Sequence, residues 1–152
     1  MAIKEITAQE AHDLLEKEAG CVYIDVRTVR EFSAGHPQGG VNIPVAFPDP
    51  AQGMAMNDEF VKVVERHFPK DKKIIVGCQA GPRSDAAARL LQEAGYQDVS
   101  SMQGGFGGMR DPVGNVIAPG WSSLGLPVSQ ENGAGVSYES LLSAVSGTGR
   151  AS

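Results

Sequence analysis

Cysteine is scarce in this chain, since its 152 residues include only Cys21 and Cys78. Two cysteines cannot make a disulfide framework, and neither belongs to a C-x-x-C pair. The three histidines, His12, His36 and His67, lie far apart and lack the spacing of metal ligands. We therefore expect no structural zinc site and no metal cofactor.

Positive charge and long apolar runs are also scarce. The formal net charge is -5 and no basic cluster reverses it, so binding to nucleic acid would gain little from counterion release. No apolar run approaches the ~20 residues that cross a bilayer, and residues 1–5 lack the apolar stretch of a signal peptide. We expect a cytoplasmic protein with no nucleic-acid and no membrane partner.

The composition fits one globular domain followed by a tail. Hydrophobic residues make up 41% of the chain and charged residues 20%, which is ordinary for a protein with a real core. After Pro127 the chain becomes rich in Ser, Gly, Asn and Ala. The sequence predicts a domain over residues 1–128 and a flexible tail over residues 129–152. A helical pattern at 138–145 is too short to be stable alone in water.

Helices and strands alternate along the chain. Capping-box patterns open two predicted helices, over residues 7–18 and 28–34. Apolar residues at helical spacing predict two more, over 58–68 and 84–94. Nearly continuous apolar runs predict buried strands over residues 21–26, 73–77 and 99–102. Segments rich in Gly and Pro predict loops over residues 36–56 and 104–120. This alternation predicts an α/β fold with a mostly parallel central sheet flanked by helices.

The segment 74–84 carries the chemistry, because a buried strand there ends at Cys78 and a short loop leads into a helix. Ligands of open parallel sheets bind outside the carboxyl ends of the strands, and the amides at a helix N-terminus carry partial positive charge. With the charge of Arg83 added, this setting favours the thiolate of Cys78 over its thiol. Cys78 is therefore the predicted nucleophile. The predicted substrate-binding residues are Gln79, Ala80, Gly81, Pro82, Arg83 and Ser84.

Cys21 lies at the start of its strand and is predicted to be a core residue. Cys21 and Cys78 should lie at opposite ends of a parallel sheet, on the order of 15 Å apart. Bridged Cα atoms lie within roughly 7 Å, so we expect no disulfide between them.

Two separated motifs resemble the rhodanese family. The loop from Cys78 to Ser84 is similar to the family's C-x-x-G-x-R-S active-site loop. The other motif is Asp25-Val26-Arg27, Glu31-Phe32, Gly35-His36, Gly39, Asn42 and Pro44. Further similarities are Gly95-Tyr96, Met102-Gln103-Gly104-Gly105-Phe106 and Gly125-Leu126-Pro127. The resemblance covers residues 3–128 and implies a small doubly wound domain with the loop at the carboxyl end of its central strand.

The resemblance implies a thiosulfate sulfurtransferase that needs no cofactor. Cys78 would carry sulfane sulfur as a persulfide from a donor such as thiosulfate to a thiophilic acceptor, cyanide or a thiol. The implied partners are small sulfur donors, thiol acceptors and a protein that accepts sulfur. Arg83 would attract the anionic donor, while Asp25, Arg27 and Glu31 would brace the loop.

The sequence also departs from the family. Met109 stands where the family usually has a Trp, and residues 110–120 look like an insertion before Trp121. One alternative function is a non-enzymatic persulfide carrier or regulatory module that relays sulfur to a protein.

A cysteine phosphatase or arsenate reductase is a further alternative. Phosphatases place five residues between cysteine and arginine, whereas only four separate Cys78 from Arg83. Pro82 supplies no N–H to a phosphate cradle. The loop length therefore argues against phosphate chemistry.

Overall fold

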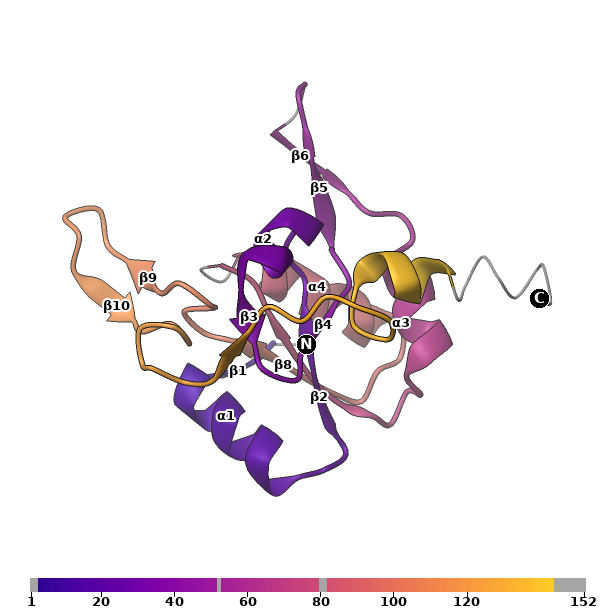
Figure 1. Ribbon diagram of the computed structural model, residues 1–152, viewed down its shortest axis with the longest axis horizontal. Coiled ribbons are helices and arrows are strands. Elements are labelled where there is room, and N and C mark those ends of the chain that lie inside the picture. Colours follow the sequence, from indigo (N-terminus) through magenta and orange to yellow (C-terminus); the bar gives the residue numbers. More distant parts are fainter. Residues whose placement is uncertain (1–2, 52, 80–81, 144–152) are drawn as a thin grey trace.

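A five-stranded parallel sheet forms the centre of the protein (Figure 1). The structure is a computed structural model that describes residues 3–51, 53–79 and 82–143. Every neighbouring pair of strands in this sheet is parallel. In spatial order the strands are β1 (Lys4–Ile6), β8 (Asp98–Met102), β7 (Lys73–Gly77), β2 (Cys21–Asp25) and β4 (Val41–Asn42). The α/β fold with a mostly parallel sheet is thus confirmed.

Helices cover both faces of this sheet. A hydrophobic cluster lies on each face of the sheet, and the side chains of a strand alternate between the two faces. In β7, Ile75 belongs to the cluster beneath α1 (Ala8–Lys17), while Ile74 and Val76 belong to the other cluster. That second cluster contains residues of α3 (Phe60–His67) and α4 (Pro82–Glu93). The arrangement is doubly wound, as the resemblance implied.

Both predicted capping boxes are formed. At the start of α1, the Thr7 hydroxyl accepts the backbone N–H of Glu10, and the Glu10 carboxylate accepts the backbone N–H of Thr7. Thr28 and Glu31 do the same at the start of α2 (Val29–Ala34). The local sequence signals therefore set the two helix starts correctly.

The segments predicted as loops contain short strands, so that prediction was wrong in part. β5 (Ala46–Asp49) and β6 (Gly53–Met56) form one antiparallel hairpin, and β9 (Met109–Arg110) and β10 (Val116–Ala118) form another. Strands of two to four residues are too short to leave a readable alternation in the sequence. β3 (His36–Pro37) was missed for the same reason.

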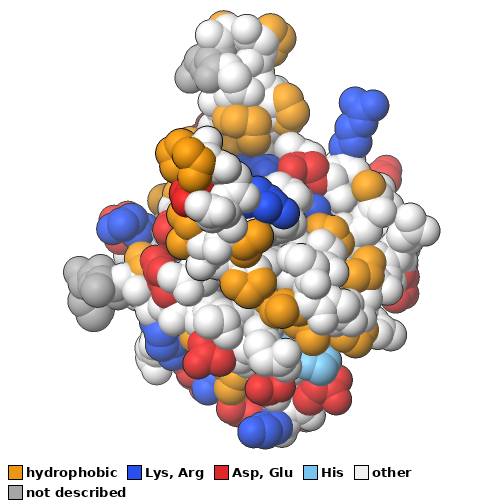
Figure 2. Space-filling view, turned by 90° about the vertical axis from the view of Figure 1, so that its left-hand side faces the viewer, with side chains coloured by type: hydrophobic (Ala, Val, Ile, Leu, Met, Phe, Trp, Pro, Cys, Tyr) orange, Lys and Arg blue, Asp and Glu red, His pale blue; other side chains and the backbone are white. Residues whose placement is uncertain are grey.

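Both hairpins project from the body of the protein (Figure 1). Figure 2 faces the β9–β10 side and shows hydrophobic side chains on the upper projection and across this face. The hairpins and their connecting turns leave five large apolar side chains exposed: Met54, Met56, Val113, Val116 and Ile117.

The β9–β10 hairpin accounts for the insertion seen in the sequence. Its two ends meet so closely that a Cβ on Gly120 would lie 2.3 Å from the Gly108 amide nitrogen. Trp121 then donates its backbone N–H to Gly105, and its buried indole packs near Tyr23. The extra residues thus loop out and return the chain to the core at Trp121.

The described part of the predicted tail packs on the domain. β11 (Val128–Ser129) pairs with β3, and residues 138–143 are helical. Tyr138 and Leu141 are buried, and the Tyr138 hydroxyl accepts a hydrogen bond from Asn57. The apolar residues at 138, 141 and 142 form a stripe at helical spacing that the core completes. Residues 129–143 therefore contact the domain, while the flexibility of the tail stays a prediction and residues 144–152 lie outside the described part of the chain.

Candidate active site

Cys78 follows β7 at the carboxyl edge of the sheet, where Gly77 pairs with Asp25 of β2. Only 1% of its surface is exposed. Its carbonyl oxygen accepts the Phe106 N–H at 2.7 Å, and the Gln79 carbonyl accepts the Gly107 N–H at 2.9 Å. The segment after β8 therefore pins the first two residues of the active-site loop.

This close approach requires glycine. Gly105 has a φ of +58°, and a Cβ there would lie 2.3 Å from the Cys78 carbonyl oxygen. A Cβ on Gly77 would lie 1.8 Å from the Tyr23 hydroxyl. Side chains at these two positions would displace the cysteine or its strand.

Arg27 braces the loop from the side of β2. Its guanidinium bonds to Asp25, with the shortest distance 2.7 Å, and donates to the Gly35 carbonyl. A further N–H reaches Gln79 Oε1 at 3.2 Å, and the guanidinium lies 4.6 Å from the centre of the Phe106 ring. Arg27 is 3% exposed, so its positive charge is stabilised by the carboxylate of Asp25 rather than by water. This agrees with the bracing role that the resemblance implied.

Arg83 forms an ion pair with Glu31, which the sequence analysis did not predict. Its two terminal nitrogens lie 2.7 and 3.0 Å from the two oxygens of Glu31, as a planar fork. The hydrogen bonds from Arg83 are the largest cause that lowers the pKa of Glu31 to about 2. A quarter of the Arg83 side chain stays exposed. The pair joins α2 to the start of α4.

Ser84 lies beside the cysteine rather than at the surface. It is fully buried, and its Oγ lies 3.7 Å from Cys78 Sγ. The same Oγ is 2.8 Å from Ser101 Oγ, which donates to Asp85 at 2.7 Å. Sequence reasoning missed Ser101 and Asp85, because neither belongs to a motif and Ser101 comes from β8, a different strand.

The remaining predicted substrate-binding residues divide into two groups. Gln79 and Pro82, the residues on either side of the part of the loop that the structure does not describe, are exposed. Ala80 and Gly81 lie outside the described residues. His36, which belongs to the Gly35-His36 part of the family motif, stacks on Phe32 with ring centres 3.6 Å apart and donates its Nδ1–H to the Phe32 carbonyl.

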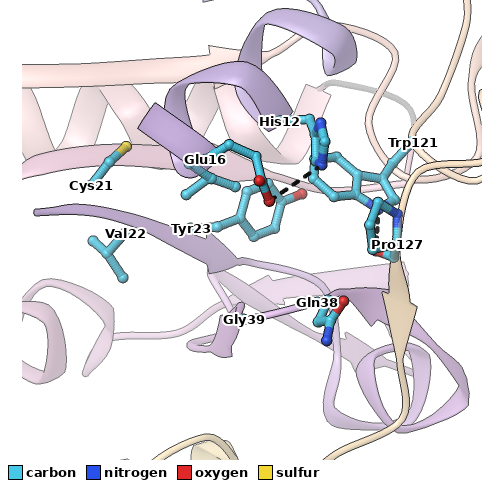
Figure 3. Close-up of a pocket in the computed structure, with 10 residues that line it drawn as sticks. His12, Glu16, Cys21, Val22, Tyr23, Gln38, Gly39, Trp121 and Pro127 are labelled. Carbon is cyan, nitrogen blue, oxygen red and sulfur yellow. Dashed lines mark hydrogen bonds and ion pairs between the residues drawn. The ribbon is translucent and has the colours of Figure 1, made fainter. Parts of the chain in front are cut away.

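A separate pocket of about 370 Å³ lies at the other end of β2 (Figure 3). Cys21 lines this pocket with His12, Glu16 and Trp121. Burial raises the pKa of the Cys21 thiol, which disfavours a nucleophilic role. The chemistry predicted for Cys78 therefore has no counterpart here. The register of β2 and β7 puts the two cysteines at opposite ends of the sheet, and no disulfide joins them.

The described residues contain neither a membrane-spanning helix nor a cluster of metal-ligand side chains. None of their helices is long and apolar enough to cross a membrane. Their His, Cys, Asp and Glu side chains form no group of three or more that could hold a metal ion.

A family model described as Rhodanese-like domain matches residues 7–111. The chain is 39% identical to Thiosulfate sulfurtransferase 16, chloroplastic, of Arabidopsis thaliana, over 80% of this chain and 89% of that relative. It is 33% identical to Thiosulfate sulfurtransferase GlpE of Haemophilus influenzae (strain PittEE), over 71% of this chain and 89% of that one. The chain spans less of two other plant relatives, 48% of the length of each.

Among solved structures, Rv0390 from M. tuberculosis shares the fold. The TM-score is 0.69 at 28% identity, and the match covers 86% of this chain and 100% of the other.

Proposed function

The chain belongs to the rhodanese family, and from that premise we propose that it moves sulfane sulfur from a small donor to a thiophilic acceptor through a persulfide on Cys78. The observation that carries this proposal is the place of Cys78, buried at the carboxyl end of β7 and followed by α4. Ligand sites of parallel sheets lie at this edge. Relatives named thiosulfate sulfurtransferase support thiosulfate as the donor.

The reaction has two steps. The Cys78 thiolate attacks the outer sulfur of thiosulfate, the S–S bond of the donor breaks, and sulfite leaves with the bonding electrons. Cyanide or a thiolate then attacks the terminal sulfur of the persulfide, and the electrons of the breaking S–S bond return to Cys78. This is covalent catalysis with ping-pong kinetics.

The charges at the site suit an anionic donor. Arg83 keeps a quarter of its side chain exposed beside the loop, and Glu31 holds it in one orientation through two hydrogen bonds. Arg27 is buried and bonds to Asp25, Gly35 and Gln79, so it serves the loop rather than the substrate. We assign donor attraction to Arg83 for these reasons.

A non-enzymatic carrier that passes sulfur to a protein is the second candidate. The exposed apolar side chains of the two hairpins favour it, because such surfaces are typical of proteins that bind partners. The burial of Cys78 favours the enzyme instead, since a small donor reaches a buried thiol more easily than a folded protein does.

The test is a steady-state assay with thiosulfate and cyanide, run beside an assay with an aryl phosphate. The proposal predicts thiocyanate production that Cys78→Ser abolishes and Cys21→Ser keeps, with no phosphate release. Rapid loading of Cys78 with very slow turnover would favour the carrier. Phosphate release that depends on Cys78 would overturn the sulfurtransferase reading.

A further inference from the structure

A chain of hydrogen bonds links the buried Cys78 thiol to a carboxylate. It runs from Cys78 Sγ to Ser84 Oγ at 3.7 Å, on to Ser101 Oγ at 2.8 Å, and then to Asp85 Oδ1 at 2.7 Å. The first three residues are at most 1% exposed, whereas Asp85 is only partly buried. We call these four residues the hydroxyl relay. It connects a thiol that solvent barely reaches with a group that solvent does reach.

The direction of each bond in the relay follows from counting hydrogens. An ionised carboxylate only accepts, and a serine hydroxyl has a single hydrogen. The contact between Ser101 and Asp85 therefore uses the Ser101 hydrogen. The contact between Ser84 and Ser101 must then use the Ser84 hydrogen. What remains for the sulfur contact is the hydrogen of the thiol, so Cys78 donates and Ser84 accepts.

We propose that Ser101 and Asp85 are positioning residues that control the protonation of Cys78 by fixing the direction of the Ser84 hydroxyl. The inference rests on the proposed function only in taking Cys78 as the sulfur-carrying residue. With Asp85 ionised, the Ser84 hydrogen points away from the sulfur, so the relay donates no hydrogen bond to Cys78. When Ser101 no longer accepts from Ser84, that hydrogen turns toward the sulfur and stabilises the thiolate.

The relay also gives the thiol proton a way out. The proton passes from Sγ to Ser84 Oγ, the Ser84 proton to Ser101, and the Ser101 proton to Asp85, which releases it to water. Each hydroxyl gains one proton and loses one, so the net change is one proton from sulfur to solvent. After this transfer, the Ser84 O–H points at the thiolate.

Other titratable and charged groups also act on Cys78 from the elements around it. Arg83 on α4 acts as a cation held by Glu31 of α2. Tyr23 on β2 stays neutral, because burial raises its pKa well above the ordinary value. The Asp25 charge at the end of β2 is paired with Arg27. None of these groups changes in the variants below, so their influence on Cys78 stays the same.

Ser101→Ala tests the proposal directly, because it removes a partner of Ser84 while keeping the Asp85 charge. The measurement is the rate at which iodoacetamide alkylates Cys78, followed by peptide mass spectrometry across a pH series. We expect alkylation about tenfold faster near neutral pH, the effect of one hydrogen bond gained by a thiolate, and a rate profile moved to lower pH. Cys21 in the same sample is the reference, and its rate should not change.

Asp85→Asn is the second variant and should also speed alkylation, because an amide can donate to Ser101 and so reverse the relay. Loss of the Asp85 charge alone would act in the same direction. Both substitutions are therefore repeated in a Ser84→Ala background, where an effect through the relay disappears and a purely electrostatic effect persists.

An unchanged or slower rate in Ser101→Ala, or a gain that survives without the Ser84 hydroxyl, would overturn the proposal. If Ser101→Ala does not fold, the two Asp85→Asn measurements decide alone. Alkylation is independent of sulfur transfer. A protein that shows the alkylation effect but takes no sulfur from thiosulfate would therefore refute the proposed function and leave the relay standing.

Discussion

At the scale of single residues, the two arginines near Cys78 have different tasks. Arg27 is buried and donates hydrogen bonds to Asp25, Gly35 and Gln79, whereas the side chain of Arg83 is partly exposed. Only Arg83 is therefore placed to meet a donor from solution. The resemblance to the family implied these two roles, whereas the burial and the partners of each arginine come only from the structure.

Arg83→Ala should weaken the use of thiosulfate and cost about 1 kcal/mol of stability, because it also removes the ion pair with Glu31. The expected rise in KM for thiosulfate is about fivefold, the size of a partly exposed ion pair worth about 1 kcal/mol. The loss should be smaller with an uncharged organic polysulfide, and steady-state kinetics with both donors measures it. Equal losses with the two donors would mean that Arg83 acts on the shape of the loop instead.

Gly105→Ala should damage the site more than an equivalent change elsewhere. A left-handed backbone costs a non-glycine residue about 1–2 kcal/mol, and here the new Cβ would also clash with the Cys78 carbonyl. Gly125→Ala is the matched control, with a φ of +72° and open space around it. We expect both variants to lose stability in urea unfolding, but only Gly105→Ala to lose sulfur loading. Equal activity in the two variants would contradict the pinning of the loop.

At the scale of the elements, sequence reasoning succeeded where a signal is local. Three kinds of signal were each contained within a few consecutive residues: the apolar run of β7, the capping boxes, and the order of residues from Cys78 to Ser84. The N–H of Phe106 on the Cys78 carbonyl joins residues 28 apart, and no local pattern reports it. The hydrogen bond between Ser84 and Ser101 was missed for the same reason.

The sequence showed a helical pattern at the carboxyl-terminal helix, residues 138–143, but not its packing on the domain, because the surrounding composition is polar. Leu141 is 5% exposed in the core beside α3. Leu141→Ala should lower the free energy of unfolding by about 2–3 kcal/mol, whereas Glu139→Ala, at an exposed position, should change it by less than about 0.5 kcal/mol.

A chain ending at Gln130 should melt at a lower temperature than the full chain, for the same reason. Thermal unfolding followed by circular dichroism compares the full chain with the shortened chain, Leu141→Ala and Glu139→Ala. Melting temperatures that match the full chain in both Leu141→Ala and the shortened chain would show that this helix adds nothing to stability.

The ion pair between α2 and α4 gives the protein a pH-dependent stability. The pKa of Glu31 is lowered from 4.5 to about 2, chiefly by the Arg83 hydrogen bonds. Such a carboxylate stabilises the fold above its ordinary pKa, and the contribution is lost as pH falls from 4.5 toward 2.

Glu31→Gln should cost about 1 kcal/mol at pH 7, a value discounted because a third of the side chain is in solvent. The difference from the parent should shrink as the pH falls from 4.5 to 2. Glutamine keeps the capping box, so urea unfolding at several pH values isolates the ion pair. A difference that stays constant with pH would assign the loss to packing.

At the scale of the whole molecule, the fold brings one cysteine to the carboxyl edge of the sheet and keeps the other away from it. Cys78 lies at the carboxyl end of β7, pinned by the segment after β8 and flanked by Arg83. Cys21 lies at the opposite end of the sheet, where burial raises its pKa and favours the thiol. The parallel register alone separates the two roles, and the doubly wound topology supplies the loop and helix after Cys78.

The most direct test of the central claim is the mass of the intact protein after incubation with thiosulfate. We expect the mass to rise by one sulfur atom, to return to its starting value on addition of cyanide, and to behave the same way in Cys21→Ser. Cys78→Ser should show no change at either step. Sulfur gained by Cys78→Ser, or no sulfur gained by the parent protein, would contradict the account.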